Sequence, residues 1–237
     1  IVLVDTHHKA QLPNDFPYDK VVAIFDHHPN GNDDLFPSAD ITNRKIGAAA
    51  SIVAELYFKR DIIDVPMLKL LAYAILSNTL NFSAPSSTEF DHNIFEQICR
   101  VATIEPEIVN KMFEQRSLIL KKDIYTALCA DFKIFDTKSG RVGISQLEVY
   151  DLEKLIDISA CIDALQRIAS ENNIGLCLFN GVDIKSRRSV VIAADNQTQE
   201  LIKSLFDLDA CRKFQVFNRI LLRKTDFIPQ LNQEETG

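Results

Sequence analysis

Two adjacent pairs of histidines stand close to aspartates near the start of the chain. They are four of the five histidines present: His7, His8, His27 and His28. Asp5 follows the apolar run Ile1–Val4, and Asp26 follows the apolar run Val21–Phe25. Carboxylate oxygens and imidazole nitrogens suit Mn²⁺, Co²⁺, Fe²⁺ or Zn²⁺, and oxygen-rich sites favour Mn²⁺ or Mg²⁺. Because the arrangement occurs twice, we favour a metal site over polar residues that only end strands.

The apolar runs explain how these residues would meet. Both runs are short, continuous and β-branched, which is typical of strands buried on both faces of a parallel sheet. In open α/β sheets, ligands bind at the carboxyl ends of the strands. Asp5 and the triplet Asp26–His28 would therefore lie side by side. Two metals bridged by a carboxylate would convert a bound water to hydroxide and hold a phosphoryl group.

The remaining elements predict an α/β protein with two domains. After a loop over 29–40, we expect helices over 47–59, 66–77, from a cap at Ser87 or Thr88 to 102, and over 105–120. Further on we expect strands over 141–149, 176–182, 189–194 and 217–222, and helices over 151–172 and 197–206. A parallel-sheet domain would span 1–115 and a smaller α/β domain 122–237. The join at 115–125 would act as a hinge.

Composition narrows the class of protein. The 237 residues carry a net charge of −7, with a pI near 5.3, which argues against binding nucleic acid. No apolar run reaches the roughly 18–20 residues that span a bilayer. Five scattered cysteines never form a Cys-x-x-Cys pair, which argues against a disulfide framework or structural zinc and favours a reducing compartment, the cytoplasm.

Several segments resemble one family of phosphohydrolases. Asp26-His27-His28 after an apolar strand, with Val4-Asp5 on the preceding strand and the Gly47–Ile52 helix, resembles the DHH phosphoesterase superfamily. Ala74–Phe82 followed by Ala84–Thr88 is similar to the fourth motif of family II (manganese-dependent) inorganic pyrophosphatases. Asp131–Phe135, Val142–Val149 and Arg223-Lys224 before Pro229 resemble a DHHA2 domain. The resemblance covers about residues 1–231.

The resemblance implies a metal-dependent phosphoanhydride hydrolase that splits inorganic pyrophosphate into two phosphates. It implies two Mn²⁺ ions in the complete protein, with Co²⁺ or Mg²⁺ as possible replacements. Asp5 would bridge the metals, His27 would bind one of them, and Asn78 stands at a metal-binding position. Asp26 would orient the histidines, while His28 would contact phosphate and donate a proton to the leaving group. Lys133, Arg223 and Lys224 would grip the pyrophosphate oxygens.

The chain departs from the family pattern at several positions. Asn78 replaces an aspartate, and its neutral amide should weaken a site for two cations. Ser83, Pro29 and Thr225 each replace a basic residue. The family's first motif, His-x-x-x-Asp-x-Asp, is not in this chain, and because the chain opens within a predicted strand we expect an N-terminal segment upstream of Ile1. His7 or His8 could compensate as an extra ligand or phosphate contact.

These departures leave alternatives open. The same chemistry could act on short polyphosphate, as in an exopolyphosphatase, or on a small phosphoester. A second alternative is a catalytically impaired homologue that binds a phosphorylated ligand without turnover, which Asn78 favours. We also expect that the edge strand of the first domain could support a homodimer.

Overall fold

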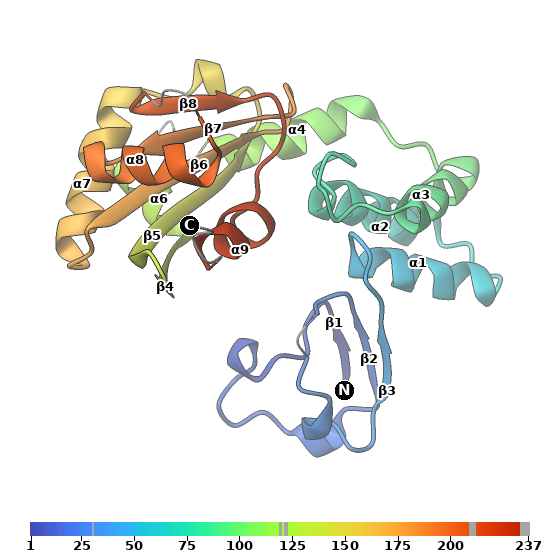
Figure 1. The fold of residues 1–237 in the computed structure, drawn as a ribbon. Helices are drawn as coiled ribbons and strands as arrows, with labels where there is room; N and C mark the ends of the chain where they lie inside the picture. The colour runs from blue at the N-terminus through green and yellow to red at the C-terminus, as the bar shows by residue number, and fades with distance from the viewer. Residues whose placement is uncertain (30, 119, 121–122, 209–211, 233–237) are drawn as a thin grey trace. The chain divides into compact units, whose positions relative to one another are not determined.

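The computed structural model describes residues 1–29, 31–118, 120, 123–208 and 212–232 (Figure 1). Contacts divide the chain into two compact units, unit 1 over Ile1–Val109 and unit 2 over Asn110–Gly237. The division falls within helix α4 (Pro106–Ser117), just before the predicted join at 115–125. Among the described residues, no helix combines the length and apolarity needed to cross a membrane. The α/β class predicted from the sequence is confirmed.

Unit 1 opens with a parallel sheet of three strands. Strands β1 (Val2–Val4), β2 (Ala23–Asp26) and β3 (Asp40–Asn43) lie in that order, with Leu3 beside Ile24 and Ile24 beside Ile41. The parallel pairing of the first two strands is therefore as predicted. β3 was not predicted, because its polar ends resemble the loop before it.

The connections of this sheet contain 3₁₀ turns in place of the helices expected of an α/β crossover. The turns are Lys9–Gln11 and Tyr18–Lys20 between β1 and β2, and Asp33–Leu35 between β2 and β3. Their side chains bury one face of the sheet, where Phe36 packs with Leu3 and Ile24. The opposite face leaves Val2 and Val4 exposed.

Helices make up the rest of unit 1. They are α1 (Ala49–Lys59), α2 (Val65–Asn78), α3 (Glu89–Val101) and the start of α4; three lie within the predicted helical segments, and α2 extends one residue beyond its predicted 66–77 at each end. Asp64 caps α2, and Thr88 rather than Ser87 caps α3. Small and branched residues, Ala54, Leu68, Ile75 and Ile98 among them, form their common core.

A buried carboxylate ties the first turns of two of these helices together. Asp91 accepts hydrogen bonds from Gly47 N (2.8 Å), Ser51 Oγ (2.7 Å), Thr88 N (2.9 Å) and Thr88 Oγ1 (2.7 Å). A Cβ at Gly47 would lie 2.9 Å from Asp91 Oδ2 and 2.8 Å from Thr79 Cγ2. Position 47 therefore needs glycine, because the helices approach too closely for a side chain.

Unit 2 has a mixed sheet of five strands. In spatial order they are β4 (Phe132–Thr137), β5 (Gly140–Val149), β6 (Leu176–Asp183), β7 (Arg188–Ala193) and β8 (Phe214–Phe217). β5 and β6 are parallel, and the other neighbouring pairs are antiparallel. Besides the end of α4, its described helices are α6 (Ile124–Ala130), α7 (Ile158–Glu171), α8 (Asn196–Leu205) and α9 (Ile228–Leu231).

Both faces of the unit 2 sheet are covered. Every residue of β6 is buried, and successive residues pack on opposite faces. Phe179 belongs to the core that α7 covers, together with Leu165. Leu178 belongs to the core that α8 covers, together with Ile202. The unit is therefore a three-layer α/β/α structure, as Figure 1 shows.

Three expectations for unit 2 need correction. The helix expected over 151–172 begins at Ile158, because Asp151 has a φ of 64° and a 3₁₀ turn, Leu152–Lys154, precedes the helix. The last strand lies at 214–217 and not 217–222, since the chain leaves the sheet after Phe217. Helix α6 and strand β4 were not predicted as elements, because each is short and only partly buried.

The cysteines behave as small apolar residues where they are buried. Cys99, Cys129, Cys161 and Cys177 are free thiols, and Cys211 lies outside the described residues. Burial raises the pKa of Cys161 and of Cys177 to about 12. These two thiols are therefore protonated near neutral pH and poor nucleophiles.

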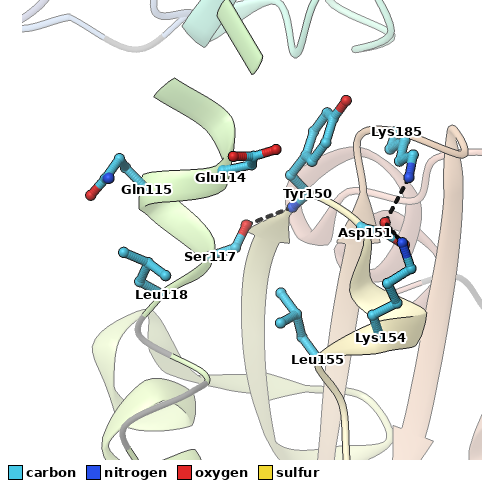
Figure 2. Close-up of a pocket in the computed structure, with 9 residues that line it drawn as sticks. All are labelled: Glu114, Gln115, Ser117, Leu118, Tyr150, Asp151, Lys154, Leu155 and Lys185. Atoms are coloured by element: carbon cyan, nitrogen blue, oxygen red, sulfur yellow. Dashed lines mark hydrogen bonds and ion pairs between the residues drawn. The ribbon is translucent and has the colours of Figure 1, made fainter. Parts of the chain in front are cut away.

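A pocket of about 620 Å³ lies within unit 2, beside the last turn of α4 (Figure 2). Asp151 on its wall pairs through one oxygen with Lys154 (2.8 Å) and Lys185 (2.6 Å). None of the predicted site residues lines this pocket.

Candidate functional site

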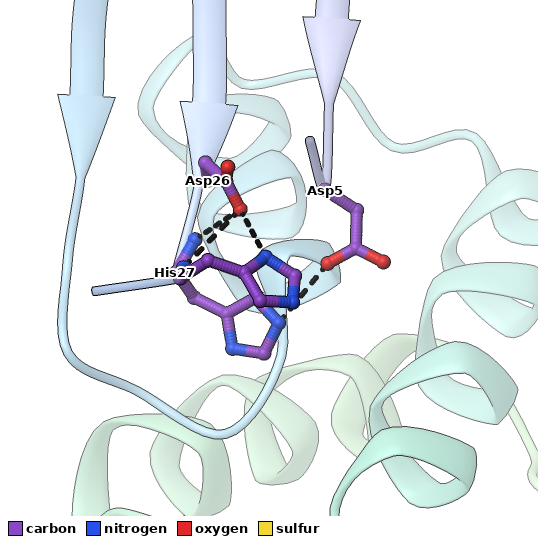
Figure 3. A group of neighbouring side chains, drawn as sticks. Asp5, Asp26 and His27 are labelled. Atoms are coloured by element: carbon purple, nitrogen blue, oxygen red, sulfur yellow. Dashed lines mark hydrogen bonds and ion pairs between the residues drawn. The ribbon is translucent and has the colours of Figure 1, made fainter. Parts of the chain in front are cut away.

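Four side chains gather where β1 and β2 end. Asp5, Asp26, His27 and His28 each offer a ligand atom, and these atoms lie within 4.8 Å of one another. Figure 3 shows Asp5 just beyond the end of β1 and Asp26 and His27 at the end of its neighbour β2. The expectation that parallel strands bring these residues together is confirmed.

Asp5 and His27 present the two donors best placed for a metal. Asp5 Oδ1 lies 3.0 Å from His27 Nε2. Two ligands about 2.1 Å from one ion and at right angles to each other are separated by roughly this distance. His27 Nδ1 donates to the carbonyl oxygen of Ile46 (2.9 Å), so the neutral ring leaves the Nε2 lone pair available. This oxygen and nitrogen donor pair fits a divalent transition metal.

The backbone and charges around this pair are unusual. Asp5 has a φ of 66°, in the left-handed region, which non-glycine residues adopt at a cost that is often associated with functional sites. Burial by itself lowers the pKa of His27. Hydrogen bonds to Asp5 and Ile46, with the charges of Asp5 and Asp26, more than offset burial, so the pKa lies above its usual range. Metal binding at Nε2 therefore competes with a proton whose binding these contacts favour.

Asp26 is fully buried and orients its neighbours. Its Oδ1 accepts from His27 N (2.7 Å), His28 N (3.3 Å) and His28 Nδ1 (2.8 Å), and its Oδ2 contacts His7 Nδ1. Burial raises the pKa of Asp26, but the hydrogen bonds from His28, His7 and the backbone outweigh it and hold the pKa below its usual range. Asp26 is therefore a carboxylate whose oxygens are occupied by these N–H groups.

The imidazole of His28 is held through its Nδ1. Its Nδ1 bonds to Asp26, and its ring lies against that of His27, with centroids 4.5 Å apart. The side chain is about one-third exposed, at 34%. Nε2 lies on the opposite side of the ring from Asp26 and can face a substrate.

His7 and His8 have separate roles in the structure. His7 is buried, with Nδ1 on Asp26 and Nε2 3.1 Å from Asp33 Oδ1. His8 caps the turn Lys9–Gln11, where its Nδ1 accepts from Ala10 N. His7 therefore holds the Oδ2 atom of Asp26 in place, a structural role that the sequence pattern did not indicate. Neither ring belongs to the group of four.

Asn78 is the last residue of α2 and is exposed. Among the described residues, no hydrogen bond joins its amide to the Asp5–His28 cluster, so its predicted metal role stays a prediction. Three left-handed residues, Leu80, Asn81 and Phe82, follow with φ between 50° and 59°. Such a turn of non-glycine residues is strained, and Thr79 Oγ1, which accepts from Phe82 N (3.1 Å), braces it.

In unit 2, two of the three predicted cations meet at one carboxylate. Arg223 is 4% exposed, and its Nη2 donates to Asp131 Oδ1 (2.8 Å) and Oδ2 (2.9 Å). Its Nη1 donates to the carbonyl oxygens of Asp131 (2.7 Å) and Ile144 (3.0 Å). Lys133 Nζ lies 3.7 Å from Asp131 Oδ1. The structure therefore groups Lys133 with Arg223, and their predicted contact with pyrophosphate remains a prediction.

Lys224 follows Arg223 in a π-helical turn, Arg223–Phe227, and is exposed. Asp226 stabilises this turn by accepting from Leu222 N (2.9 Å), Thr225 Oγ1 (2.8 Å) and Arg219 Nη1 (2.6 Å). Within the described part of the chain, Lys224 forms no ion pair with an acidic residue. Its ammonium is therefore available to an external anion.

Comparisons with known proteins agree with this arrangement. Residues 110–233 match the DHHA2 domain family. The manganese-dependent inorganic pyrophosphatase of Methanocaldococcus jannaschii is 27% identical over all of this chain and 80% of its own length. The cobalt-dependent inorganic pyrophosphatase of Clostridium perfringens is 25% identical over 98% of this chain and 43% of its own length.

A solved structure from Methanococcus jannaschii, assigned to the family II inorganic pyrophosphatases, has the same fold. It superposes with a TM-score of 0.71 at 26% identity, over 98% of this chain and 78% of that one. The family match covers more than half of the chain, and both units are included in the structural match. The chain therefore belongs to the DHHA2 family, and its Asp26-His27-His28 triplet places it in the DHH phosphoesterase superfamily, with the family II inorganic pyrophosphatases.

Proposed function

We propose that this protein is a metal-dependent hydrolase that splits inorganic pyrophosphate into two phosphates. The observation that carries the proposal is the Asp5–His27 pair, whose oxygen and nitrogen lie 3.0 Å apart at the ends of two parallel strands. The names of the relatives point to the same substrate, and to manganese or cobalt as the metal.

Asp5 and His27 would hold the metal. Once bound there, it would lower the pKa of a coordinated water and place positive charge next to the phosphoryl oxygens. Asp26, whose oxygens are engaged by four N–H groups, would fix the ring of His28 and the backbone at His27, and is itself no ligand in this proposal.

His28 would meet the substrate through Nε2. With Nδ1 bound to Asp26, the ring keeps one orientation and can donate a proton from Nε2 to the departing phosphate. Lys133, Arg223 and Lys224 would neutralise the charge of pyrophosphate, which is compact and highly charged.

We further propose a site for two metals in the complete protein, with Asp5 as the shared ligand and Asn78 as an additional one. An amide oxygen can coordinate a metal but carries no charge, so a second cation would be bound more weakly than at a carboxylate. Asn78 follows three helical turns of α2 and precedes the strained turn at 80–82. That turn would fix the position of the amide.

The test is phosphate release from pyrophosphate by the full-length gene product. Wild type and Asn78→Asp are assayed side by side in Mn²⁺, after treatment with EDTA and after metal is restored. Tripolyphosphate and a small phosphodiester serve as competing substrates. We expect pyrophosphate to be the best substrate, no release in EDTA, and at least tenfold tighter Mn²⁺ binding by Asn78→Asp, measured by calorimetry, since one charge is added to the site.

Three results would change this conclusion. Faster release from tripolyphosphate or the diester would move the substrate to polyphosphate or a phosphoester. Release by Asn78→Asp alone would mean that the scaffold is intact and that Asn78 inactivates it. Binding of pyrophosphate without release by either form would indicate a ligand-binding protein.

A further inference from the structure

An acidic residue, Asp131, contacts two of the three cations that are predicted to bind the substrate, Arg223 and Lys133. Asp131 lies between the end of α6 and the start of β4, and its side chain is 42% exposed. Its carboxylate faces Arg223 on one side through two hydrogen bonds of 2.8 and 2.9 Å, and Lys133 Nζ at 3.7 Å from Oδ1. Two cations and one carboxylate leave a net charge of +1 in this cluster, formed by Lys133, Arg223 and Asp131.

The sheet fixes this carboxylate and its partner from behind. Gln146 on β5 donates from its backbone N to Asp131 O (3.2 Å) and accepts from Arg223 N (2.7 Å) through Oε1. The same Oε1 accepts from Asn180 Nδ2 (3.1 Å), which also donates to Leu221 O (2.8 Å). The backbone of Asp131 is therefore held by the backbone of β5, and the backbone at 221–223 by side chains of β5 and β6.

We propose that Asp131 is a positioning residue for recognition of the phosphate substrate. It holds the guanidinium of Arg223 and the ammonium of Lys133 at one place, so that an incoming anion meets a preorganised pair of cations. This inference rests on the proposed function, since it assigns the same cations to pyrophosphate. It adds Asp131, whose negative charge would repel the anionic substrate in direct contact.

The charges explain why an acidic residue helps here. Arg223 is nearly buried, and without Asp131 both hydrogens of Nη2 would lose their acceptor. An exposed lysine without a partner samples many rotamers and must be ordered when the ligand binds, which weakens binding. Removing Asp131 adds net positive charge, which favours an anion, but it leaves Nη2 of Arg223 without an acceptor and Lys133 without a partner, while Nη1 of Arg223 keeps its two carbonyl oxygens. We expect the loss of order to dominate, because the guanidinium is buried and the lysine is long.

The experiment compares Asp131→Asn, Asp131→Glu and a matched control, Asp136→Asn. Asp136 lies on the same strand β4, is 90% exposed and pairs weakly with Arg141 at 3.5 Å. KM and kcat for pyrophosphate are measured on the holoenzyme. The affinity for imidodiphosphate, an analogue with a nitrogen bridge, is measured by calorimetry, and urea midpoints report folding.

We expect Asp131→Asn to raise KM for pyrophosphate and the dissociation constant of imidodiphosphate about tenfold, with kcat changed less than about threefold. The reason is that charge-assisted hydrogen bonds that order the cations for binding are lost. Asp131→Glu should recover part of the loss, since it restores the charge at a longer reach. Asp136→Asn should match wild type. If Asp131→Asn does not fold, a folded Asp131→Glu with raised KM carries the same expectation.

Unchanged KM and analogue affinity in a folded Asp131 variant would overturn the inference, as would tighter binding. A fall in kcat that follows the folded fraction, with KM unchanged, would make Asp131 merely structural. If wild type releases no phosphate but binds the analogue and Asp131→Asn binds it more weakly, the hydrolase proposal fails and this inference stands. If wild type does not bind the analogue, both fail.

Discussion

Asp26 provides the sharpest test of how unit 1 builds its site. The carboxylate is fully buried and accepts from four N–H groups, two on backbone and two on imidazoles. Asp26→Ala leaves all four without this acceptor. His7 is 1% exposed, so water cannot replace the lost partner at its Nδ1, whereas the groups of His28 are partly exposed and can be hydrated.

The magnitude follows from these contacts. A buried donor without a partner costs roughly 1–3 kcal/mol. With His7 counted over the whole range and the three partly buried groups at about 1 kcal/mol each, Asp26→Ala should lower the free energy of unfolding by about 4–6 kcal/mol. Asp26→Asn keeps the shape and one acceptor oxygen, but it loses the charge and replaces the other acceptor with an NH₂ donor, so about 1–3 kcal/mol is expected. Both variants should lose 10–100-fold in metal affinity or activity, because the rings that it orients are released.

The assay separates stability from metal binding. Urea unfolding is followed by far-UV circular dichroism in EDTA, because the chain has no tryptophan to report by fluorescence. Asp33→Asn is the matched control: Asp33 lies 3.1 Å from the other nitrogen of His7, but its side chain is 65% exposed. We expect a change below about 0.5 kcal/mol for that exposed residue.

The pH dependence gives a second readout with a fixed sign. The pKa of Asp26 is lower in the folded protein than in the unfolded chain, so its stabilisation is complete above about pH 4. It is lost as the pH falls through the folded pKa. The difference between wild type and Asp26→Asn should therefore shrink on acidification. Equal stability of Asp26→Ala and Asp33→Asn, or a difference that grows with acid, would refute the reasoning.

Two further predictions concern the rest of unit 1. Asp91→Ala should lower the free energy of unfolding by roughly 3–5 kcal/mol, since four donors lose a buried acceptor. The control is Asp64→Ala, which removes an exposed helix cap and should cost about 1 kcal/mol. Similar values for the two variants in urea unfolding would contradict the burial argument. The raised pKa of His27 stabilises the metal-free fold below the unfolded pKa of about 6.5, and this stabilisation is lost as pH rises through the folded pKa. The advantage of wild type over His27→Gln in EDTA should therefore decline as the pH rises from about 6.5 through the folded pKa, while Mn²⁺ affinity increases; a pH-independent difference would count against this assignment.

The cluster at the ends of β1 and β2 could be predicted, because the same short segments of sequence signal both the strands and the polar residues that follow them. Val4-Asp5 and Phe25-Asp26 place a polar residue directly after an apolar strand, and parallel pairing brings the two strand ends together. The helices were predicted for a similar reason, since their apolar spacing and the cap at Thr88 are contained in a short window.

The partners of those residues could not be predicted, because they are distant in sequence or unremarkable in type. His7 lies 19 positions from Asp26, and Arg223 lies 92 positions from Asp131. Leu80 and Phe82 are not turn-forming residues, so nothing in the sequence signals a left-handed turn there. These features depend on tertiary contacts that override local preference.

Asp26 in unit 1 and Asp131 in unit 2 each hold neighbouring side chains in place through a carboxylate. Asp26 contacts the rings of His28 and His7, and Asp131 contacts Arg223 and Lys133. In our proposals His28, Arg223 and Lys133 meet the substrate, and the two carboxylates do not. A group that binds a trianion or tetraanion must be ordered before the ligand arrives, or the cost of ordering is taken from the binding energy. Carboxylates achieve that order for positive groups, at the expense of some attraction for the anion. The Asp26 and Asp131 substitutions therefore test one principle in two units, and the Asp26 variants should act mainly on metal affinity while the Asp131 variants act mainly on KM.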